Sequence, residues 1–399
     1  MKRILLTLSV ILCLVLSLNI ISTQAETYSG NCGTGVTYTM DTDTGVLTIS
    51  GTGAMQDYPI LADVPWFSYK SDVKTVVIED GITSIGEQAF GYCENLTEIT
   101  IPDGVTSIDQ FAFEHCSSLK KIEIPDGVTS IGFSAFVGCD SLVSVTIPDS
   151  VTSIDQRAFM SCNSLTKIVI PDGVTSISHR AFCGCYSLTE IVIPDSVTSI
   201  GYESFGRCRN LTEITIPDSV TSIDQFAFCE CSSLKKIEIP DGVTSIGWAM
   251  LGNCESLTEV TIPSSVTNID DHAFNDCNAL TDVYFTGSEE EWNEISIGSY
   301  NECMTNATIH YNHALKDNNE IEVEYSIENN VISLMCKNIA EDTIIYATMV
   351  VGGIVKTVEV NLTDEKGSIN IEDNAETVKI FVWESFESMS PLCEAIKVK

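Results

Sequence analysis

The segment LTEITIPDGVTSIDQFAFEHCSS, residues 96–118, decides the fold, because most of the chain is a variation on it. In its first part, Ile99 and Ile101 alternate with polar neighbours, which is the pattern of a half-buried strand. Pro102 cannot donate to a β ladder and ends this strand, and the Asp-Gly pair that follows favours a turn. The segment therefore begins with a short strand and a turn.

The second part of the segment predicts another short strand and a compact turn. In the run VTSI, Val105 and Ile108 have the spacing of inward-facing residues. The remaining run, DQFAFEHC, is too short for an independently stable helix. We expect it to form a helical turn that inserts Phe113 and Cys116 into the core.

This segment repeats every 23 residues. Cysteine, leucine and isoleucine each recur at that step in nine coils, and phenylalanine does so with Leu251 as the exception. The cysteine column consists of Cys93, Cys116, Cys139, Cys162, Cys185, Cys208, Cys231, Cys254 and Cys277. A fixed period in the twenties is typical of a solenoid in which neighbouring coils bury each other's apolar side. We therefore predict a mainly β solenoid of 23-residue coils.

The segments beside the coils are expected to close the stack, because open strand edges invite aggregation. Residues 26–72 lack the period and contain two alternating runs around Gly45, which predicts an N-terminal β cap. At the other end, Ser288 and Glu291 have capping-box spacing, so we expect a short helix that carries Trp292. The solenoid and its C-terminal cap are assigned to residues 73–311.

The composition changes at residue 312, where the period is lost. The runs IEVEYSI, VISLMCKNI and TVKIFVWESF are rich in β-branched and aromatic residues, and a hairpin is expected at Gly352 and Gly353. Residues 312–399 are therefore predicted to form a separate small β-sandwich-like domain. The alternative is an extension of the solenoid, which the lost period disfavours.

The N-terminus has the pattern of a secretory signal peptide. Lys2 and Arg3 precede an apolar run that extends to Ile21, and small residues follow as far as Ala25. We expect residues 1–25 to be removed on export, with a retained membrane anchor as the alternative. No later stretch is apolar and long enough to cross a bilayer, so no transmembrane segment is expected in the mature chain. The predicted location is secreted or extracellular, with or without association with the cell surface.

The charge of the chain excludes one class of partner. Fifty-six acidic residues against 20 basic ones give a formal net charge of -36. Such a field repels phosphate backbones, so nucleic acid is not an expected partner. The same field is compatible with an exported, soluble protein that is attracted to basic patches on other molecules.

The coil pattern L-T-E-I-T-I-P-D-G-V-T-S-I-x-x-x-A-F-x-x-C-x-S resembles the leucine-rich repeat of the BspA-like, or treponemal-type, bacterial surface antigens, over roughly residues 73–284. The runs GTGVTYTMDTDTGVLTISGTGAM and VYFTGSEEEWNEISIG are similar to the leader and the terminating segment of such arrays. The resemblance implies a mainly β leucine-rich-repeat solenoid, attachment to host matrix proteins or other cells, and neither a catalytic motif nor a cofactor.

The cysteines are expected to be core thiols. Fifteen follow the expected cleavage point, so complete internal pairing is impossible. Neighbouring column cysteines approach disulfide distance, and disulfides remain the alternative. The pairs Cys183/Cys185 and Cys229/Cys231 are two coils apart, about 10 Å at strand spacing, which is too far for four thiolates around one zinc. No metal site is predicted.

An aspartate column accompanies the Pro-Asp turns. Stacked carboxylates can recruit calcium, but calcium needs several oxygen ligands that converge on one point. We favour local turn hydrogen bonding instead. The column consists of Asp80, Asp103, Asp126, Asp149, Asp172, Asp195, Asp218 and Asp241.

Two positions after each Thr-Ser-Ile vary from coil to coil and carry aromatic, histidine and arginine side chains. Aromatic and arginine residues are enriched at the centres of protein interfaces, and a solenoid presents them on an extended face. The alternative is that the rings tuck under neighbouring coils. The candidate ligand-binding residues are Phe111, Phe133, Arg157, His179, Arg180, Tyr202, Phe226 and Trp248.

These observations predict a binding protein of the adhesion type, without catalysis, whose partner is a protein or cell-surface ligand. The main alternative is a glycan-binding module in which the exposed aromatic side chains stack on sugars. A hydrolase is the third choice. The five histidines have no repeated acidic or nucleophilic partner, although a triad assembled by folding is recognised only by its geometry.

Overall fold

The computed structural model describes residues 26–313 and, beyond them, the backbone of the strands between Glu322 and Lys397. The expected signal peptide, residues 1–25, lies outside the described residues. The chain divides into two compact units, Met1–His313 and Ala314–Lys399. The finer limits of the caps and of the solenoid stay predictions.

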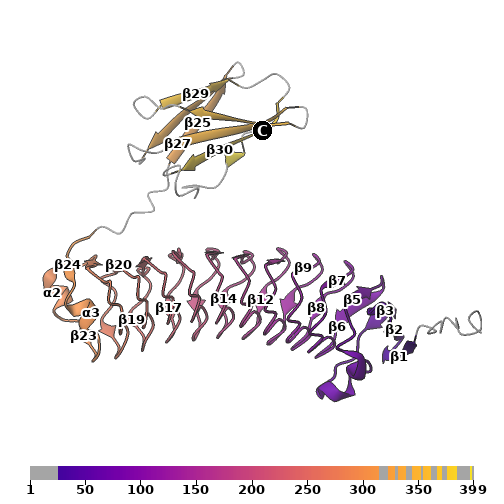
Figure 1. The fold of residues 1–399 in the computed structure, drawn as a ribbon. Helices are drawn as coiled ribbons and strands as arrows, with labels where there is room; N and C mark the ends of the chain where they lie inside the picture. Colours follow the sequence, from indigo (N-terminus) through magenta and orange to yellow (C-terminus); the bar gives the residue numbers. More distant parts are fainter. Residues whose placement is uncertain are drawn as a thin grey trace, which may run out of the picture. The chain divides into compact units, whose positions relative to one another are not determined.

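The first unit begins with an antiparallel sheet that caps the solenoid (Figure 1). Strand β1 (Thr27–Gly33) pairs with β2 (Val36–Asp41), and β2 pairs with β3 (Val46–Gly51) across the predicted turn, where Gly45 has a φ of 77°. Strand β3 then pairs in parallel with β5 (Thr75–Ile78), the first strand of the coils. Two short 3₁₀ helices, η1 (Leu61–Asp63) and η2 (Phe67–Tyr69), complete this end. A β cap at this end is therefore confirmed.

The coils stack in parallel with a register of 23 residues and form two rows of short strands, the strand ladders, whose hydrogen-bonded pairing is interrupted at intervals (Figure 1). The described residues from 212 to 216 form no strand in the first ladder. After β5, the first ladder contains β7 (Glu98–Thr100), β9 (Lys121–Glu123), β11 (Ser144–Thr146), β13 (Lys167–Val169), β15 (Glu190–Val192), β18 (Lys236–Glu238), β20 (Glu259–Ile262), β22 (Asp282–Phe285) and β24 (Thr308–His310). The second contains β4 (Gly53–Ala54), β6 (Ile82–Ile85), β8 (Ser107–Ile108), β10 (Ser130–Ile131), β12 (Ser153–Ile154), β14 (Ser176–Ile177), β16 (Ser199–Ile200), β17 (Ser222–Ile223), β19 (Ser245–Ile246), β21 (Asn268–Ile269) and β23 (Ser296–Ile297).

The predicted helical turn is wrong in its backbone conformation. Phe111 and His115 have left-handed φ angles of 59° and 56°, so the segment is a series of turns. Their N–H groups, with that of Phe113, donate to carbonyl oxygens of the next coil at 2.7 to 2.9 Å. These bonds between coils satisfy backbone N–H groups that, in a helix, would have bonded to carbonyl groups of the same segment. Phe113 and Cys116 are nevertheless fully buried, as expected.

The core consists of the predicted columns. Phe113, Phe136 and Phe159 are fully buried and stack with ring centroids 5.2 Å apart. At the N-terminal end, Trp66 continues the row 5.9 Å from Phe90, and its indole N–H donates to a backbone oxygen. Offset stacking of this kind adds to the burial free energy of each ring.

The C-terminal end is closed by two short helices, α2 (Glu289–Trp292) and α3 (Glu302–Thr305). Ser288 and Glu291 form the predicted capping box, and Trp292 packs on Phe285 at 5.2 Å. Asn301, which sequence reasoning missed, is 2% exposed and accepts the Phe274 N–H at 3.0 Å. The side-chain oxygen of Asn301 therefore takes the place of the backbone carbonyl group that a further coil would provide.

The second unit contains two antiparallel sheets, which agrees with the predicted small β domain. The first contains, in spatial order, β25 (Glu322–Glu328), β26 (Val331–Lys337) and β29 (Lys366–Asn370). The second contains, in spatial order, β28 (Ile354–Val360), β27 (Ile344–Val351), β30 (Ala375–Trp383) and β31 (Ile396–Lys397). The predicted hairpin joins β27 and β28, which pair antiparallel, although its two glycines lie outside the described residues.

Within the part of the chain that the structure describes, no helix combines the length and the apolar composition that crossing a membrane requires.

Candidate functional site

The candidate binding residues lie on turn segments whose backbone is fixed by bonds between coils. A turn segment comprises residues 87–94 in the first coil and the equivalent residues at each step of 23. The second position of each segment has a left-handed φ, for example 58° at Arg157 and 59° at Phe226. Because L-residues rarely adopt this conformation, it persists only where the surrounding structure imposes it. The side chains at these positions are therefore held on a rigid frame.

The structure brings three of the candidate residues together near the start of the array. The rings of Phe111 and Phe133 meet edge to face at 5.2 Å. The guanidinium group of Arg157 lies over the Phe133 ring, 5.6 Å from its centroid. Phe111, Phe133 and Arg157 are all half-buried, so each keeps part of its surface in water.

The other five candidate residues join a longer row of contacts. Arg180 lies over Tyr202 at 5.2 Å, Tyr202 meets Phe226 at 5.4 Å, and Phe226 meets Trp248 at 4.6 Å. His179 is more peripheral, with its ring 6.3 Å from that of Tyr202. We call the eight candidate residues the ridge.

Two residues that were not predicted as ligand-binding extend this row. His272 lies 5.3 Å from Trp248 and stacks on Tyr300 at 4.2 Å. His272 shares the column of Arg180 and could have been found there. Tyr300 follows the end of the period, so no repeat signal identifies it.

The aromatic side chains are partly packed under neighbouring coils and partly exposed on the face of the solenoid. Tyr202 and Phe226 are half-buried against neighbouring coils, whereas Trp248 is 38% exposed and Tyr300 is 56% exposed. The rings therefore support one another and still present apolar surface to solvent.

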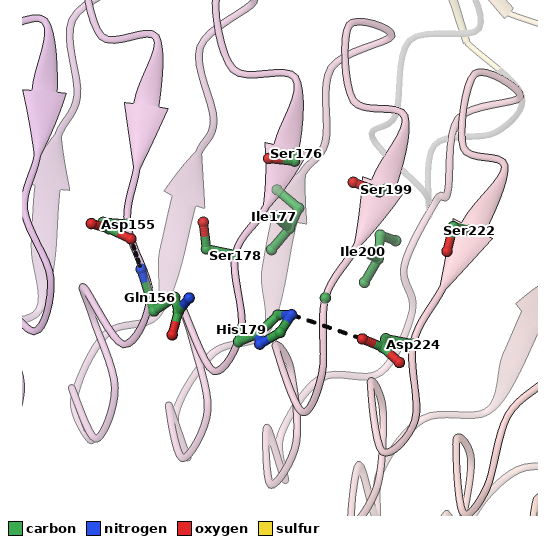
Figure 2. A pocket seen from close by; sticks show the side chains of 11 residues that line it. Asp155, Gln156, Ser176, Ile177, Ser178, His179, Ser199, Ile200, Ser222 and Asp224 are labelled. Carbon is green, nitrogen blue, oxygen red and sulfur yellow. Dashed lines mark hydrogen bonds and ion pairs between the residues drawn. The ribbon is translucent and has the colours of Figure 1, made fainter.

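A groove of about 320 Å³ runs along the strand side of the ridge, and Figure 2 shows the side chains that line it. The imidazole Nε2 of His179 lies 3.8 Å from a carboxylate oxygen of Asp224, two coils away. Gly201 lies in the coil between them, where a Cβ would come within 2.7 Å of the imidazole. The absence of a side chain at Gly201 therefore leaves room for the two groups to face each other.

This groove contains serine, histidine and aspartate without the bonds of a catalytic triad. Ser178 donates its hydroxyl to the carbonyl oxygen of Ile154 at 2.6 Å. Among residues 26–313, no serine hydroxyl is hydrogen-bonded to the His179 ring. A general base acts within hydrogen-bond reach of its nucleophile, and the Ser178 hydroxyl is bonded to the Ile154 carbonyl instead.

A second groove, of about 390 Å³, lies beside Trp248. Its polar walls include Gln225, Asn268 and Asp271. The Asn268 amide donates to Asp270 at 2.7 Å, and Asp271 accepts the Ser299 N–H at 2.6 Å. The groove thus combines an exposed indole with carboxylate and amide groups.

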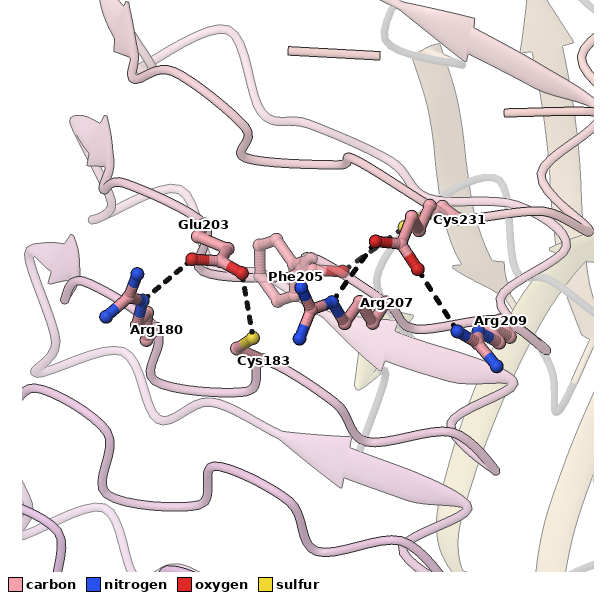
Figure 3. A network of polar contacts seen from close by, with 8 residues as sticks. Arg180, Cys183, Glu203, Phe205, Arg207, Arg209 and Cys231 are labelled. Carbon is pink, nitrogen blue, oxygen red and sulfur yellow. Dashed lines mark hydrogen bonds and ion pairs between the residues drawn. The ribbon is translucent and has the colours of Figure 1, made fainter. Parts of the chain in front are cut away.

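On the other side of the ridge, charged side chains of successive coils form a row, which Figure 3 shows. Arg180 donates from Nε to Glu203 at 2.7 Å, and Arg207 donates from Nε to Glu230 at 3.2 Å. Arg209 donates to the same Glu230 carboxylate at 3.1 Å. Arg180, Glu203, Arg207 and Glu230 line a third hollow of about 240 Å³ together with Tyr202, Phe226 and Cys229.

The thiols near this row are not poised as nucleophiles or metal ligands. Burial raises the pKa of Cys183 to about 12, with a further contribution from Glu203. Burial also raises the pKa of Cys229 to about 11. Both thiols are protonated at neutral pH, and the thiolate is the reactive and metal-binding form. No cluster of three or more possible metal ligands occurs in the described part of the chain.

The aspartate column occupies turns, and the expected hydrogen bonds from its side chains to the backbone stay a prediction. The N–H of Val105 donates to the carbonyl of Pro102 at 3.1 Å, and the same bond recurs between Val128 and Pro125 at 3.0 Å. Asp103 and Asp126 are the exposed residues inside these turns.

A family comparison assigns most of this unit to one repeat type. The model described as the BspA type leucine rich repeat region matches residues 65–189 and 175–308, in 6 copies. Together these ranges cover more than half of the chain and include the ridge and all three hollows. A comparison with curated proteins gives no match.

Solved structures of leucine-rich repeat proteins are also similar. The one from Bacteroides ovatus is 30% identical, with 70% of this chain and 70% of that chain covered and a TM-score of 0.55. The one from Eubacterium ventriosum is 27% identical over 66% of this chain and 86% of that chain, with a TM-score of 0.44. A leucine rich cell surface protein from Faecalibacterium prausnitzii is 29% identical over 68% of this chain and 98% of that chain, with a TM-score of 0.32.

Proposed function

The chain belongs to the family of BspA-type leucine-rich repeat proteins, and from this premise we propose that it is an extracellular binding protein of the adhesion type. The predicted leucine-rich-repeat solenoid is confirmed by the family match and by the fold. Solenoids of this kind are repeat proteins that mediate protein interaction through an extended face. The finer proposal is that the ridge is that face, and that its partner is a protein or cell-surface ligand such as a host matrix protein.

The observation that carries this proposal is the row of ring contacts from Arg180 to Tyr300. Arginine, tyrosine and tryptophan are the residue types that dominate binding energy at protein interfaces. Here the coils hold them in place before any ligand arrives, which lowers the entropy that binding would otherwise cost. The half-buried rings and the exposed Trp248 and Tyr300 agree with a preformed binding surface.

The direct experiment is affinity capture with the mature chain from host and microbial extracts. A variant with Phe111, Tyr202, Phe226 and Trp248 replaced by alanine serves as the comparison. A ligand of the ridge is retained by the wild-type protein and lost by this variant. Equal capture by both proteins would contradict the proposal.

The groove beside Trp248 favours one second candidate, which is binding of a glycan. An exposed indole can stack on a sugar ring while Gln225, Asn268 and Asp271 accept and donate hydrogen bonds to its hydroxyl groups. A glycan array compared with a panel of matrix proteins separates the two candidates. Binding to the array that is lost in a Trp248→Ala variant would favour the glycan.

The proposal includes export and the absence of catalysis. Mass spectrometry of the secreted protein is expected to find a mature N-terminus after residue 25, and an intact Met1 in the secreted fraction would contradict this. Serine- and cysteine-reactive activity probes are expected to leave the protein unlabelled. Labelling that requires His179 would instead support the hydrolase alternative.

A further inference from the structure

The arginines of the chain are concentrated on neighbouring turn segments. Four of the five arginines lie between residues 157 and 209, in three consecutive coils, and no turn segment of the nine coils contains a lysine. The net charge is -36, but charges beyond about 8 Å are largely screened at physiological ionic strength. A ligand that touches these coils is therefore exposed mainly to the local charge. We call Arg157, Arg180, Arg207 and Arg209 the arginine patch.

Three of these guanidinium groups lie over aromatic rings. Such stacking orients the planar group and leaves the N–H donors at its edge available for another partner. The pairs are Arg157 with Phe133 at 5.6 Å, Arg180 with Tyr202 at 5.2 Å, and Arg209 with Tyr186 at 5.1 Å.

The arginine patch contains more positive than negative charge. Its four guanidinium groups form ion pairs with only two carboxylates, those of Glu203 and Glu230. In the described part of the chain, Arg157 has no carboxylate within 4.0 Å. Arg180 and Arg207 bond through Nε, so these bonds do not occupy their terminal Nη groups. Terminal guanidinium nitrogens pair well with the two oxygens of an incoming carboxylate.

The hollow between Arg180 and Arg207 combines these donors with apolar walls. It has a volume of about 240 Å³, and the rings of Tyr202 and Phe226 form part of its lining. The size suits a single side chain. A partner that places a carboxylate beside an apolar or aromatic side chain would use both features at once.

We propose that the arginine patch is the docking site for an acidic segment of a partner protein. The carboxylates of this segment pair with the arginine patch, and an adjacent aromatic or apolar side chain packs against Tyr202 and Phe226. Charge complementarity selects this occupant, because positive charge predominates here within a strongly acidic chain. The inference rests on the proposed function, since Arg157 and Arg180 belong to the ridge.

The test uses the full mature chain and a fluorescent peptide of Glu-Glu-Tyr-Gly repeats. The same peptide with glutamine in place of glutamate is the charge control. Arg180→Gln combined with Arg207→Gln should weaken binding of the acidic peptide by about tenfold or more, because charge-assisted bonds are lost. Arg157→Gln, which breaks no ion pair and leaves no carboxylate unpaired, should weaken it several-fold. Lys121→Gln combined with Lys236→Gln, on the strand ladder, should leave the affinity unchanged.

Equal binding of the two peptides, or full affinity in both arginine variants, would overturn the inference. Stronger binding of polygalacturonate than of the peptide at equal carboxylate concentration would overturn it in favour of an acidic polysaccharide. The proposed function fails separately: it is contradicted if the alanine variant of the ridge still captures the natural ligand. Capture that needs the ridge aromatics but neither Arg180 nor Arg207 would refute only the acidic-segment inference.

Discussion

The thiol of Cys116 donates a hydrogen bond to the carbonyl oxygen of Phe90, in the preceding coil, at 3.1 Å. The same bond recurs from coil to coil, at 3.1 to 3.3 Å, as far as Cys277. All described cysteines are free, so the column consists of thiols, as favoured from the sequence. The Phe90 carbonyl also accepts the N–H of Cys93 at 3.2 Å, so the thiol is its second donor and uses the remaining lone pair.

Ionisation of buried thiols such as Cys185 should destabilise the protein at alkaline pH. Burial raises the pKa of Cys185 from 9.0 to about 12, so the unfolded chain loses this proton first as the pH rises. The stabilising contribution is complete below pH 9 and is lost as the pH rises towards 12, by about 1.4 kcal/mol per unit for each such thiol. Urea unfolding at neutral and at alkaline pH measures the effect.

A Cys185→Ala variant should lose less stability between neutral and alkaline pH than the wild type, because it has one buried thiol fewer. Cys303→Ala is the control, since that thiol is only half-buried. An identical pH dependence in the wild type and the Cys185→Ala variant would contradict the account of the core.

The stacked rings of the core should contribute more to stability than the rings of the ridge. Phe159 is fully buried between Phe136 and Phe182, at 5.2 and 5.8 Å. Phe159→Ala is expected to lower the free energy of unfolding by about 3 to 5 kcal/mol. Phe226→Ala, at a half-buried ring, should cost clearly less. Equal losses in urea unfolding would mean that the ridge is part of the core and not a binding face.

Asn301 is expected to hold the last coil in place. Asn301→Ala removes the acceptor of the buried Phe274 N–H and should destabilise the protein by about 1 to 3 kcal/mol. Hydrogen exchange should increase first in the final coil. Asn275→Ala is the matched control, because the Asn275 amide bonds only to exposed Asp276. Unchanged exchange in the final coil would contradict this capping role.

The sequence predicted the parts of the structure that the period controls. Cys116, Phe113 and Leu119 are buried because every coil places the same residue type at the same depth. The left-handed φ of Phe111 was not predictable, because local preference opposes it and only hydrogen bonds between coils impose it. Tyr300 and Asn301 were missed because they follow the last full coil.

Contacts between coils could not be read from the columns alone. The approach of His179 to Asp224 depends on the missing side chain at Gly201 in the coil between them. The pairing of Arg207 with Glu230 depends on the directions of two long side chains. The columns indicated which residues vary, and the structure shows which of them meet.

The most direct test of the account is the affinity of two variants for a ligand captured by the wild-type protein. The first carries the four alanine substitutions of the ridge at Phe111, Tyr202, Phe226 and Trp248. The second carries Val143→Ala, Val169→Ala and Val192→Ala, which remove exposed apolar side chains from the strand-ladder side of the solenoid. We predict that the first variant loses binding while remaining folded and that the second binds as the wild type does. Retained binding in the first variant, whatever the second variant does, would contradict the account.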